Sequence, residues 1–388
     1  MKFSAAISAC VCMALLLTGC WDRREINDVA FVVGTAIDIE KDGYRGTLQI
    51  PLVGQMGGPQ GGGGGTSGSK AWHIESAFGK TIRGATEAEQ DHLSRILNFS
   101  HRRVFVIGKP LASRGVMPIF DAVFRIPQNR LGAFPLVALG DAKDILTADA
   151  PVEKMPAEML REVAQLATAD PINLRIFFYS LLTEGIDPIA PAVKRISAAP
   201  NIKKSKSTLE LAGIAVFRHD KLAAVLTEDD AMGLLIAMNQ ARSPILDVKA
   251  PGGSEGTIIV QLQQSKTKIE PKVDGGRIRF DLTIMAHGNV TEKMSDYPTS
   301  TTVQRDGLEH AAEKRLTDIV EHAIRKSQRH QADPIGFGDV LHRKHPRLWR
   351  DVRDRWEREE LPEMEFRVRA RVHLEHDGAL TKSLEQMK

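Results

Sequence analysis

Apolar and polar residues follow two different periods along this chain, and these periods predict its strands and helices. Residues 29–38 (VAFVVGTAID) are almost uninterrupted apolar sequence, which favours a buried strand. Residues 44–53 are the expected hairpin partner, across the turn Lys41-Asp42-Gly43. Further strands are predicted at 72–78, 103–107 and 134–139, and helices at 80–98, 116–124, 156–168 and 172–183.

The second half of the chain begins with a predicted hairpin, residues 211–217 and 222–226, followed by a helix over 231–238. Thr227 and Asp230 have the spacing of a capping box at the start of that helix. Residues 257–269 and 277–288 alternate as two long strands, and so do residues 364–374. Two helices are expected between them, over residues 308–324 and 338–359. The first has one apolar face made of Leu308, Ala312, Leu316, Ile319, Ala323 and Ile324.

Strand runs and helix runs are separated in this second half, which predicts an α+β fold with a C-terminal antiparallel sheet covered by long helices. A length of 388 residues indicates more than one domain. Residues 198–206 are small or polar and carry three lysines, so we place the boundary there. The expected domains are 20–200, with a flexible glycine-rich loop at 57–69, and 201–388.

The first nineteen residues have the features of a bacterial lipoprotein signal peptide. Lys2 precedes an apolar run from Ala5 to Leu17, which is short for a membrane span. The run ends in Leu17-Thr18-Gly19-Cys20, the pattern of a lipobox. Cleavage before Cys20 would leave its thiol to carry a diacylglyceryl group, and acyl chains such as palmitate would anchor the mature protein to the membrane.

Composition excludes several classes of function. The formal charge is 52 − 49 = +3, close to neutral for this length, which argues against a dedicated nucleic-acid binder. Cys10, Cys12 and Cys20 are the only cysteines, so no disulfide framework or cysteine-based metal site is expected in the body of the protein.

Motifs that resemble catalytic or cofactor sites lack the surrounding sequence that such sites require. Residues 63–68 match a dinucleotide-binding spacing, but no helix opens after them. Residues 252–256 match a nucleophile elbow, but a strand-like run follows them, so a hairpin loop is expected. His342 and His345 lie among basic residues, which would repel a metal ion. We therefore expect no catalytic residues, no cofactor and no metal.

Three separated blocks of sequence together resemble the Ger(x)C family, the C subunits of spore germinant receptors. The first is Gly19 to Asp28, followed by Phe31-Val32-Val33-Gly34. The second is Gly213 to Phe217 with the helix after Glu228. The third is Asp333 to Gly338, continued by Leu341 to Lys344, Pro346, Trp349 and Trp356. The glycine tract at 57–68 and Leu361 depart from the family pattern.

The resemblance implies a lipid-anchored, non-enzymatic subunit on the outer face of the inner spore membrane. Its partners would be two integral membrane subunits of the A and B types, and it would support germination in response to nutrients. Cys20 is the one functional residue that the resemblance transfers, as the lipidation site. Trp349, Val352 and Trp356 form one helical stripe, which we interpret as core.

Two other classes of lipoprotein are considered. A solute-binding lipoprotein of a transporter requires two lobes with parallel sheets around a cleft, and the terminal half is predicted to be antiparallel. A lipid-anchored cell-wall hydrolase requires paired carboxylates or a metal site, for which we identify no candidate.

Overall fold

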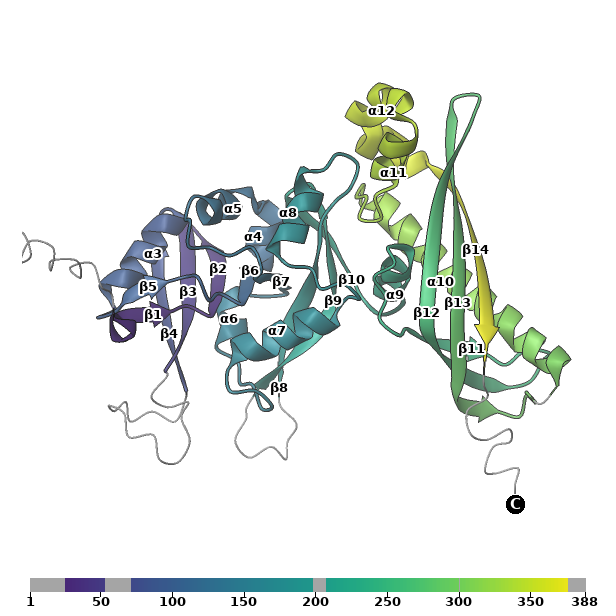
Figure 1. The fold of residues 1–388 in the computed structure, drawn as a ribbon, viewed down its shortest axis with the longest axis horizontal. Helices are drawn as coiled ribbons and strands as arrows, with labels where there is room; N and C mark the ends of the chain where they lie inside the picture. Colours follow the sequence, from purple (N-terminus) through teal and green to yellow (C-terminus); the bar gives the residue numbers. More distant parts are fainter. Residues whose placement is uncertain (1–24, 53–70, 198–206, 300, 376–388) are drawn as a thin grey trace, which may run out of the picture.

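The computed structural model describes residues 25–52, 71–197, 207–299 and 301–375. The predicted lipidation site Cys20 and the glycine-rich loop at 57–69 lie outside these residues. Two sheets dominate the fold, one of eight strands in the N-terminal half and one of four strands at the C-terminus (Figure 1). Helices cover both sheets, so the α+β class is confirmed.

The eight-stranded sheet has the order β10-β9-β8-β7-β6-β2-β3-β4. Its four central strands run parallel, whereas the strands towards both edges pair antiparallel. These strands are β2 (Gly34–Glu40), β3 (Gly43–Pro51), β4 (Trp72–Gly79), β6 (Val104–Gly108), β7 (Phe134–Ala138), β8 (Ile189–Ser197), β9 (Ser207–Arg218) and β10 (Lys221–Leu226). The predicted hairpins β2–β3 and β9–β10 are therefore confirmed.

Alternate residues of the central strands enter two different cores. Val104 and Val106 of β6 face one core, and Phe105 and Ile107 face the other. Because successive side chains in a strand point to opposite faces, both faces of this sheet need helical cover. The helices are α3 (Ile82–Asp91), α4 (Lys109–Arg114), α5 (Met117–Phe124), α6 (Ala142–Leu146), α7 (Pro156–Leu166) and α8 (Leu174–Leu182).

Two predicted N-terminal elements are shorter than the sequence pattern suggested. The run 29–38 divides into β1 (Val29–Phe31) and β2, because β1 leaves the large sheet to pair in parallel with β5 (Ile96–Asn98). The helix expected over 80–98 ends at Asp91 and is followed by β5. Local pattern could not reveal the pairing of β1 with β5, since the two strands are far apart in sequence.

The C-terminal sheet has the order β11-β12-β13-β14. β12 (Gly256–Asp274) and β13 (Arg277–Ser295) form a long hairpin, closed by Gly275 and Gly276 at positive φ. β11 (Ile245–Lys249) pairs antiparallel with β12, so residues 252–256 lie at a hairpin connection as predicted. β14 (Glu365–Leu374) alternates buried and exposed residues as predicted.

The sheet differs from the antiparallel expectation at one edge, where β14 runs parallel to β13. The chain crosses from β13 to β14 through α10 (Thr302–Arg329), α11 (Phe337–Lys344), α12 (Pro346–Val352) and α13 (Leu361–Glu363). A crossover of this kind returns the chain to the same end of the sheet, which makes the next strand parallel. The predicted apolar face of α10 is buried throughout.

Helix ends account for the remaining differences. Thr227 is the N-cap of α9 (Glu228–Ala237), but its side chain makes no capping hydrogen bond, so the predicted capping box is wrong. The helix expected over 338–359 breaks at His345-Pro346, because proline cannot continue the backbone hydrogen bonds. Arg353 pairs with Glu184 and Asp354.

The expected boundary at 198–206 is flanked by strands of one sheet, because β8 before it pairs with β9 after it. The β9–β10 hairpin thus belongs to the second half of the sequence and to the N-terminal sheet of the fold. α9 follows this hairpin and packs against α10 of the C-terminal part (Figure 1). Residues of both halves share one hydrophobic core.

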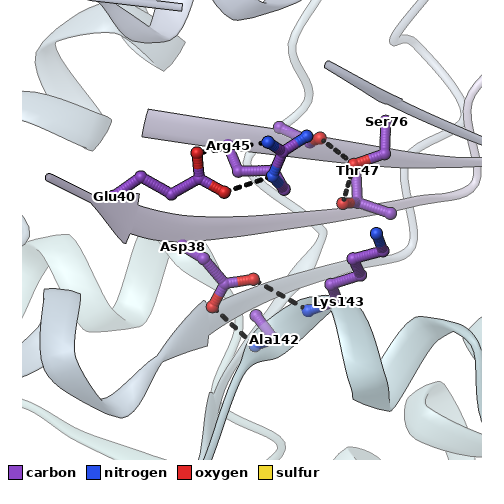
Figure 2. Close-up of polar contacts among 8 residues, drawn as sticks. Asp38, Glu40, Arg45, Thr47, Ser76, Ala142 and Lys143 are labelled. Carbon is purple, nitrogen blue, oxygen red and sulfur yellow. Dashed lines mark hydrogen bonds and ion pairs between the residues drawn. The ribbon is translucent and has the colours of Figure 1, made fainter. Parts of the chain in front are cut away.

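Polar contacts fix the ends of the central strands (Figure 2). Asp38 of β2 accepts hydrogen bonds from the backbone N–H groups of Ala142 and Lys143, at 2.6 Å and 2.9 Å. These are two of the N–H groups that a helix leaves without a partner at its N-terminus. A buried side chain on one strand therefore caps α6, which follows another strand of the same sheet.

The neighbouring strands carry two further polar pairs, also drawn in Figure 2. Arg45 of β3 forms an ion pair with Glu40 of β2. The hydroxyl groups of Thr47 on β3 and Ser76 on β4 lie 2.9 Å apart, and the Ser76 hydroxyl also donates to the carbonyl of Gly46 at 2.9 Å. These contacts hold β3 in place beside the cavity described next.

Candidate functional site

A cavity of about 720 Å³ lies where α3 and α5 cover the face formed by β2, β3 and β6. Its size is within the range of pockets that hold small molecules. Most of its lining is apolar, with Ile37, Leu48, Phe105, Val123 and Ile126 among the contributors. Of the charged residues that line it, Glu89 and Arg102 are buried, whereas Lys80, Arg83, Asp121 and Arg125 are exposed.

Glu89 and Arg102 are both buried, with 1% and 9% of their surfaces exposed. Glu89 Oε1 and Arg102 Nε and Nη1 have no hydrogen-bond partner. The Arg102 guanidinium lies 4.8 Å from the ring centre of Phe99 and 5.2 Å from that of Phe105, so cation–π attraction compensates part of its lost hydration. A buried polar group without a partner typically costs about 1–3 kcal/mol.

Burial shifts the pKa values of both groups towards their neutral forms. The pKa of Glu89 rises to about 8, first because of burial and then because Glu75 is near, while the Arg102 charge opposes the rise. Burial lowers the pKa of Arg102 to about 9, and the charge of Glu89 counteracts this. At neutral pH the cavity therefore contains a charged guanidinium and a carboxyl group that is mostly protonated.

Local sequence explains how Glu89 reaches this position. Thr81 caps α3, and its hydroxyl accepts the N–H of Gly84 at 3.0 Å. The helix then places Glu89 on the same face as Ala85, one turn earlier. Gly46 of β3 leaves room for the carboxyl group, since a Cβ atom there would lie 2.7 Å from Glu89 Oε1. The helical period is the signal in the sequence that could have revealed Glu89 as a charged residue on an apolar face.

A second polar cluster joins the two halves of the protein and centres on Asp333, which is 2% exposed. Its carboxylate accepts hydrogen bonds from the N–H groups of Gly336, Phe337 and Gly338, at 2.8–2.9 Å. It also accepts the indole N–H of Trp356 at 3.0 Å. Asp333 thus fixes the turn between α10 and α11 and orients a buried tryptophan.

The N-terminal half contacts this turn through Asp187, just before β8. One carboxylate oxygen of Asp187 accepts the N–H of Asp333 at 2.7 Å, and the other accepts the N–H of His219 at 2.7 Å. Burial raises the pKa of Asp187 to about 6. The backbones also approach closely, since a Cβ atom on Gly338 would lie 2.7 Å from the Cα of Gly185.

Asp187, His219 and Glu357 have potential ligand atoms within 4.8 Å of one another. Each already has a protein partner. Asp187 accepts the two backbone N–H groups, and Glu357 pairs with Arg218 at 3.1 Å and with the His219 ring at 3.0 Å. A guanidinium at this distance opposes a metal cation electrostatically. We therefore interpret the cluster as part of the contact between the two halves.

The tryptophans singled out in the sequence are buried, whereas His342 is at the surface. Trp349 and Trp356 are both 2% exposed, as predicted, and Trp349 donates to Glu184 at 3.0 Å. His342 is exposed and stacks on Trp349, with ring centres 5.8 Å apart. Within the described residues, no helix is both long enough and apolar enough to span a membrane.

Both halves of the chain match known families of spore germination proteins. Residues 22–195 match the family described as the spore germination protein N-terminal domain. Residues 212–378 match the family described as spore germination B3/GerAC-like, C-terminal. The two matched regions include most of the strands of both sheets, so the chain belongs to the class of spore germination proteins.

Individual relatives match over almost the whole length. YfkR of Bacillus subtilis (strain 168), described provisionally as a spore germination protein, is 41% identical over 372 residues, 96% of each chain. Spore germination protein KC of the same organism is 28% identical, covering 94% of this chain and 93% of its own. The crystal structure of the GerBC protein has the same fold, with a TM-score of 0.57 and 21% identity, and the match covers 91% of this chain and 99% of GerBC. The chain belongs to the Ger(x)C family.

Proposed function

We propose that the protein is the lipid-anchored, non-catalytic C subunit of a spore germinant receptor. The observation that carries this proposal is the match of both halves to spore germination families, preceded by a lipobox. We further propose that its partners are integral membrane A- and B-type subunits, and that it lies on the outer face of the inner spore membrane.

The lipid anchor is proposed from Leu17-Thr18-Gly19-Cys20, which lies outside the described residues. Two or more acyl chains hold a protein stably at a membrane, whereas a single chain does so only marginally. A tether also confines the protein to the membrane plane. The resulting high effective concentration favours contact with neighbouring membrane subunits, even where the isolated affinity is weak.

We propose a non-catalytic role because the buried carboxylates between the two halves are hydrogen-bonded to the backbone of the protein itself. The carboxylates of Asp333 and Asp187 accept backbone N–H groups. A transporter's solute-binding lipoprotein is the alternative. It is less favoured because the C-terminal sheet is built on an antiparallel hairpin and does not form a second parallel-sheet lobe.

The anchor is tested by Cys20→Ala, with Ser8→Ala in the signal peptide as the control. We expect the Cys20 variant to leave the membrane fraction of sporulating cells and the control to remain there, as judged by immunoblot of separated fractions. Membrane association of an unacylated Cys20→Ala protein equal to that of wild type would refute the anchor.

The receptor role is tested by cross-linking in spore membranes and by deletion of the gene. Cross-linking should recover an integral membrane protein encoded beside this gene. Deletion should slow or abolish germination with one set of nutrients while vegetative growth stays normal, and deletion of the cross-linked partner should give the same phenotype. Normal germination with every nutrient, together with no membrane partner, would refute the proposal.

A further inference from the structure

Unpaired polar atoms are concentrated in the cavity between α3 and α5. Nine buried side-chain atoms of the described residues have no hydrogen-bond partner, and five of them belong to residues that line this cavity. They are Thr35 Oγ1, Glu89 Oε1, Arg102 Nε and Nη1, and Asn129 Oδ1. Folded proteins normally pair such atoms, so these groups are available to a molecule that enters the cavity.

Glu89 and Arg102 do not satisfy each other's hydrogen-bonding groups. Glu89 and Arg102 interact electrostatically, yet Glu89 Oε1 and two Arg102 nitrogen atoms lack hydrogen bonds. One group can accept hydrogen bonds from a cation, and the other can donate a pair of hydrogen bonds to a planar anion. A molecule between them would therefore carry both an ammonium-type donor and a carboxylate-type acceptor.

We infer that this cavity binds a small zwitterion with an apolar body. The carboxylate of the ligand pairs with Arg102, and its apolar part lies against Phe105, Val123 and Ile126. Its ammonium group donates to Glu89, and this positive charge favours the ionised form of the Glu89 carboxyl group. The volume of about 720 Å³ and the mostly apolar lining fit such a molecule. This inference does not depend on the receptor role, because it concerns binding by the isolated chain.

A simple anion is the main competitor, since Arg102 alone could bind a carboxylate. Three compounds distinguish the two cases: L-phenylalanine, 3-phenylpropionate, which lacks the ammonium group, and 2-phenylethylamine, which lacks the carboxylate. L-Leucine and L-valine extend the series to smaller apolar bodies. Binding of each compound to the full chain in detergent solution is measured by isothermal titration calorimetry at neutral pH.

We expect at least one of the three amino acids to bind. Loss of a charge-assisted hydrogen bond should weaken binding at least about tenfold, so both truncated analogues of phenylalanine should bind correspondingly less tightly than the best amino acid. The inference is overturned if none of the three amino acids binds, or if 3-phenylpropionate or 2-phenylethylamine binds as tightly as the best of them.

Two conservative variants assign the contacts. Glu89→Gln should weaken amino-acid binding about tenfold or more and leave 3-phenylpropionate unaffected, while Arg102→Gln should weaken both. Arg371→Gln, at an exposed arginine on β14, is the matched control and should leave binding unchanged. Equal binding by Glu89→Gln and wild type would overturn the assignment of the ammonium contact.

A further variant, Ala122→Leu, keeps both Glu89 and Arg102 and tests the site even if Arg102→Gln does not fold. Ala122 of α5 lines the cavity and is only partly buried, so Ala122→Leu adds volume to the cavity from a tolerant position. It should reduce amino-acid binding at least about tenfold by occupying the space of the apolar body. Undiminished binding by a folded Ala122→Leu protein would place the ligand elsewhere and overturn the inference.

Discussion

Replacing Glu89 by glutamine should change how the stability of the protein depends on pH. The side chain is 1% exposed, and burial raises its pKa from 4.5 to about 8. Each pKa unit is worth about 1.4 kcal/mol, so the folded state prefers the protonated carboxyl group by about 5 kcal/mol. Glutamine resembles the protonated carboxyl group in shape and cannot ionise.

The sign follows from the direction of this shift. Because the folded-state pKa is raised, the contribution of Glu89 to stability is fully present below about pH 4.5 and is lost as the pH rises to about 8. Wild type therefore loses stability over this range through Glu89, and the variant does not. Between about pH 5 and about pH 8, the unfolding free energy of Glu89→Gln should rise by about 3–4 kcal/mol relative to wild type.

Urea unfolding, followed by the fluorescence of the buried tryptophans, measures this difference at both pH values. Burial also raises the pKa values of Asp187 and Asp333, to about 6 and about 7, but these groups are common to both proteins and cancel in the comparison. Glu87→Gln, an exposed position on the same helix, is the control and should follow wild type. Parallel pH profiles of Glu89→Gln and wild type would refute the reasoning.

Two further predictions concern the core and the glycine tract. Trp356→Ala should destabilise the protein by about 3–5 kcal/mol, because it leaves a cavity and removes a hydrogen bond to Asp333; a variant with wild-type unfolding that only loses function would instead indicate a binding surface. Replacing residues 57–68 by a short linker should shift the melting temperature little, because each doubling of loop length costs about 0.6 kcal/mol; loss of cooperative unfolding in calorimetry would show that the tract is packed.

Regular periods made many elements predictable from sequence. The apolar face of α10 repeats over several turns, and β14 alternates inward and outward residues along its length. Such repeats report burial directly, because a side chain's direction is set by the local backbone. Trp349 and Trp356 were predictable as core for the same reason, and the family followed from separated blocks of sequence.

Tertiary contacts decided the features that no local pattern contains. The parallel pairing of β14 with β13 depends on a crossover through helices. The β9–β10 hairpin joins a sheet whose other strands lie before the expected domain boundary. The cavity is likewise a product of folding. Glu89 and Arg102 are thirteen positions apart in sequence, on a helix and in a loop. The local sequence around either residue does not predict that the two side chains line one cavity. Only the packing of α3 and α5 over the sheet brings these two side chains into one mostly apolar cavity.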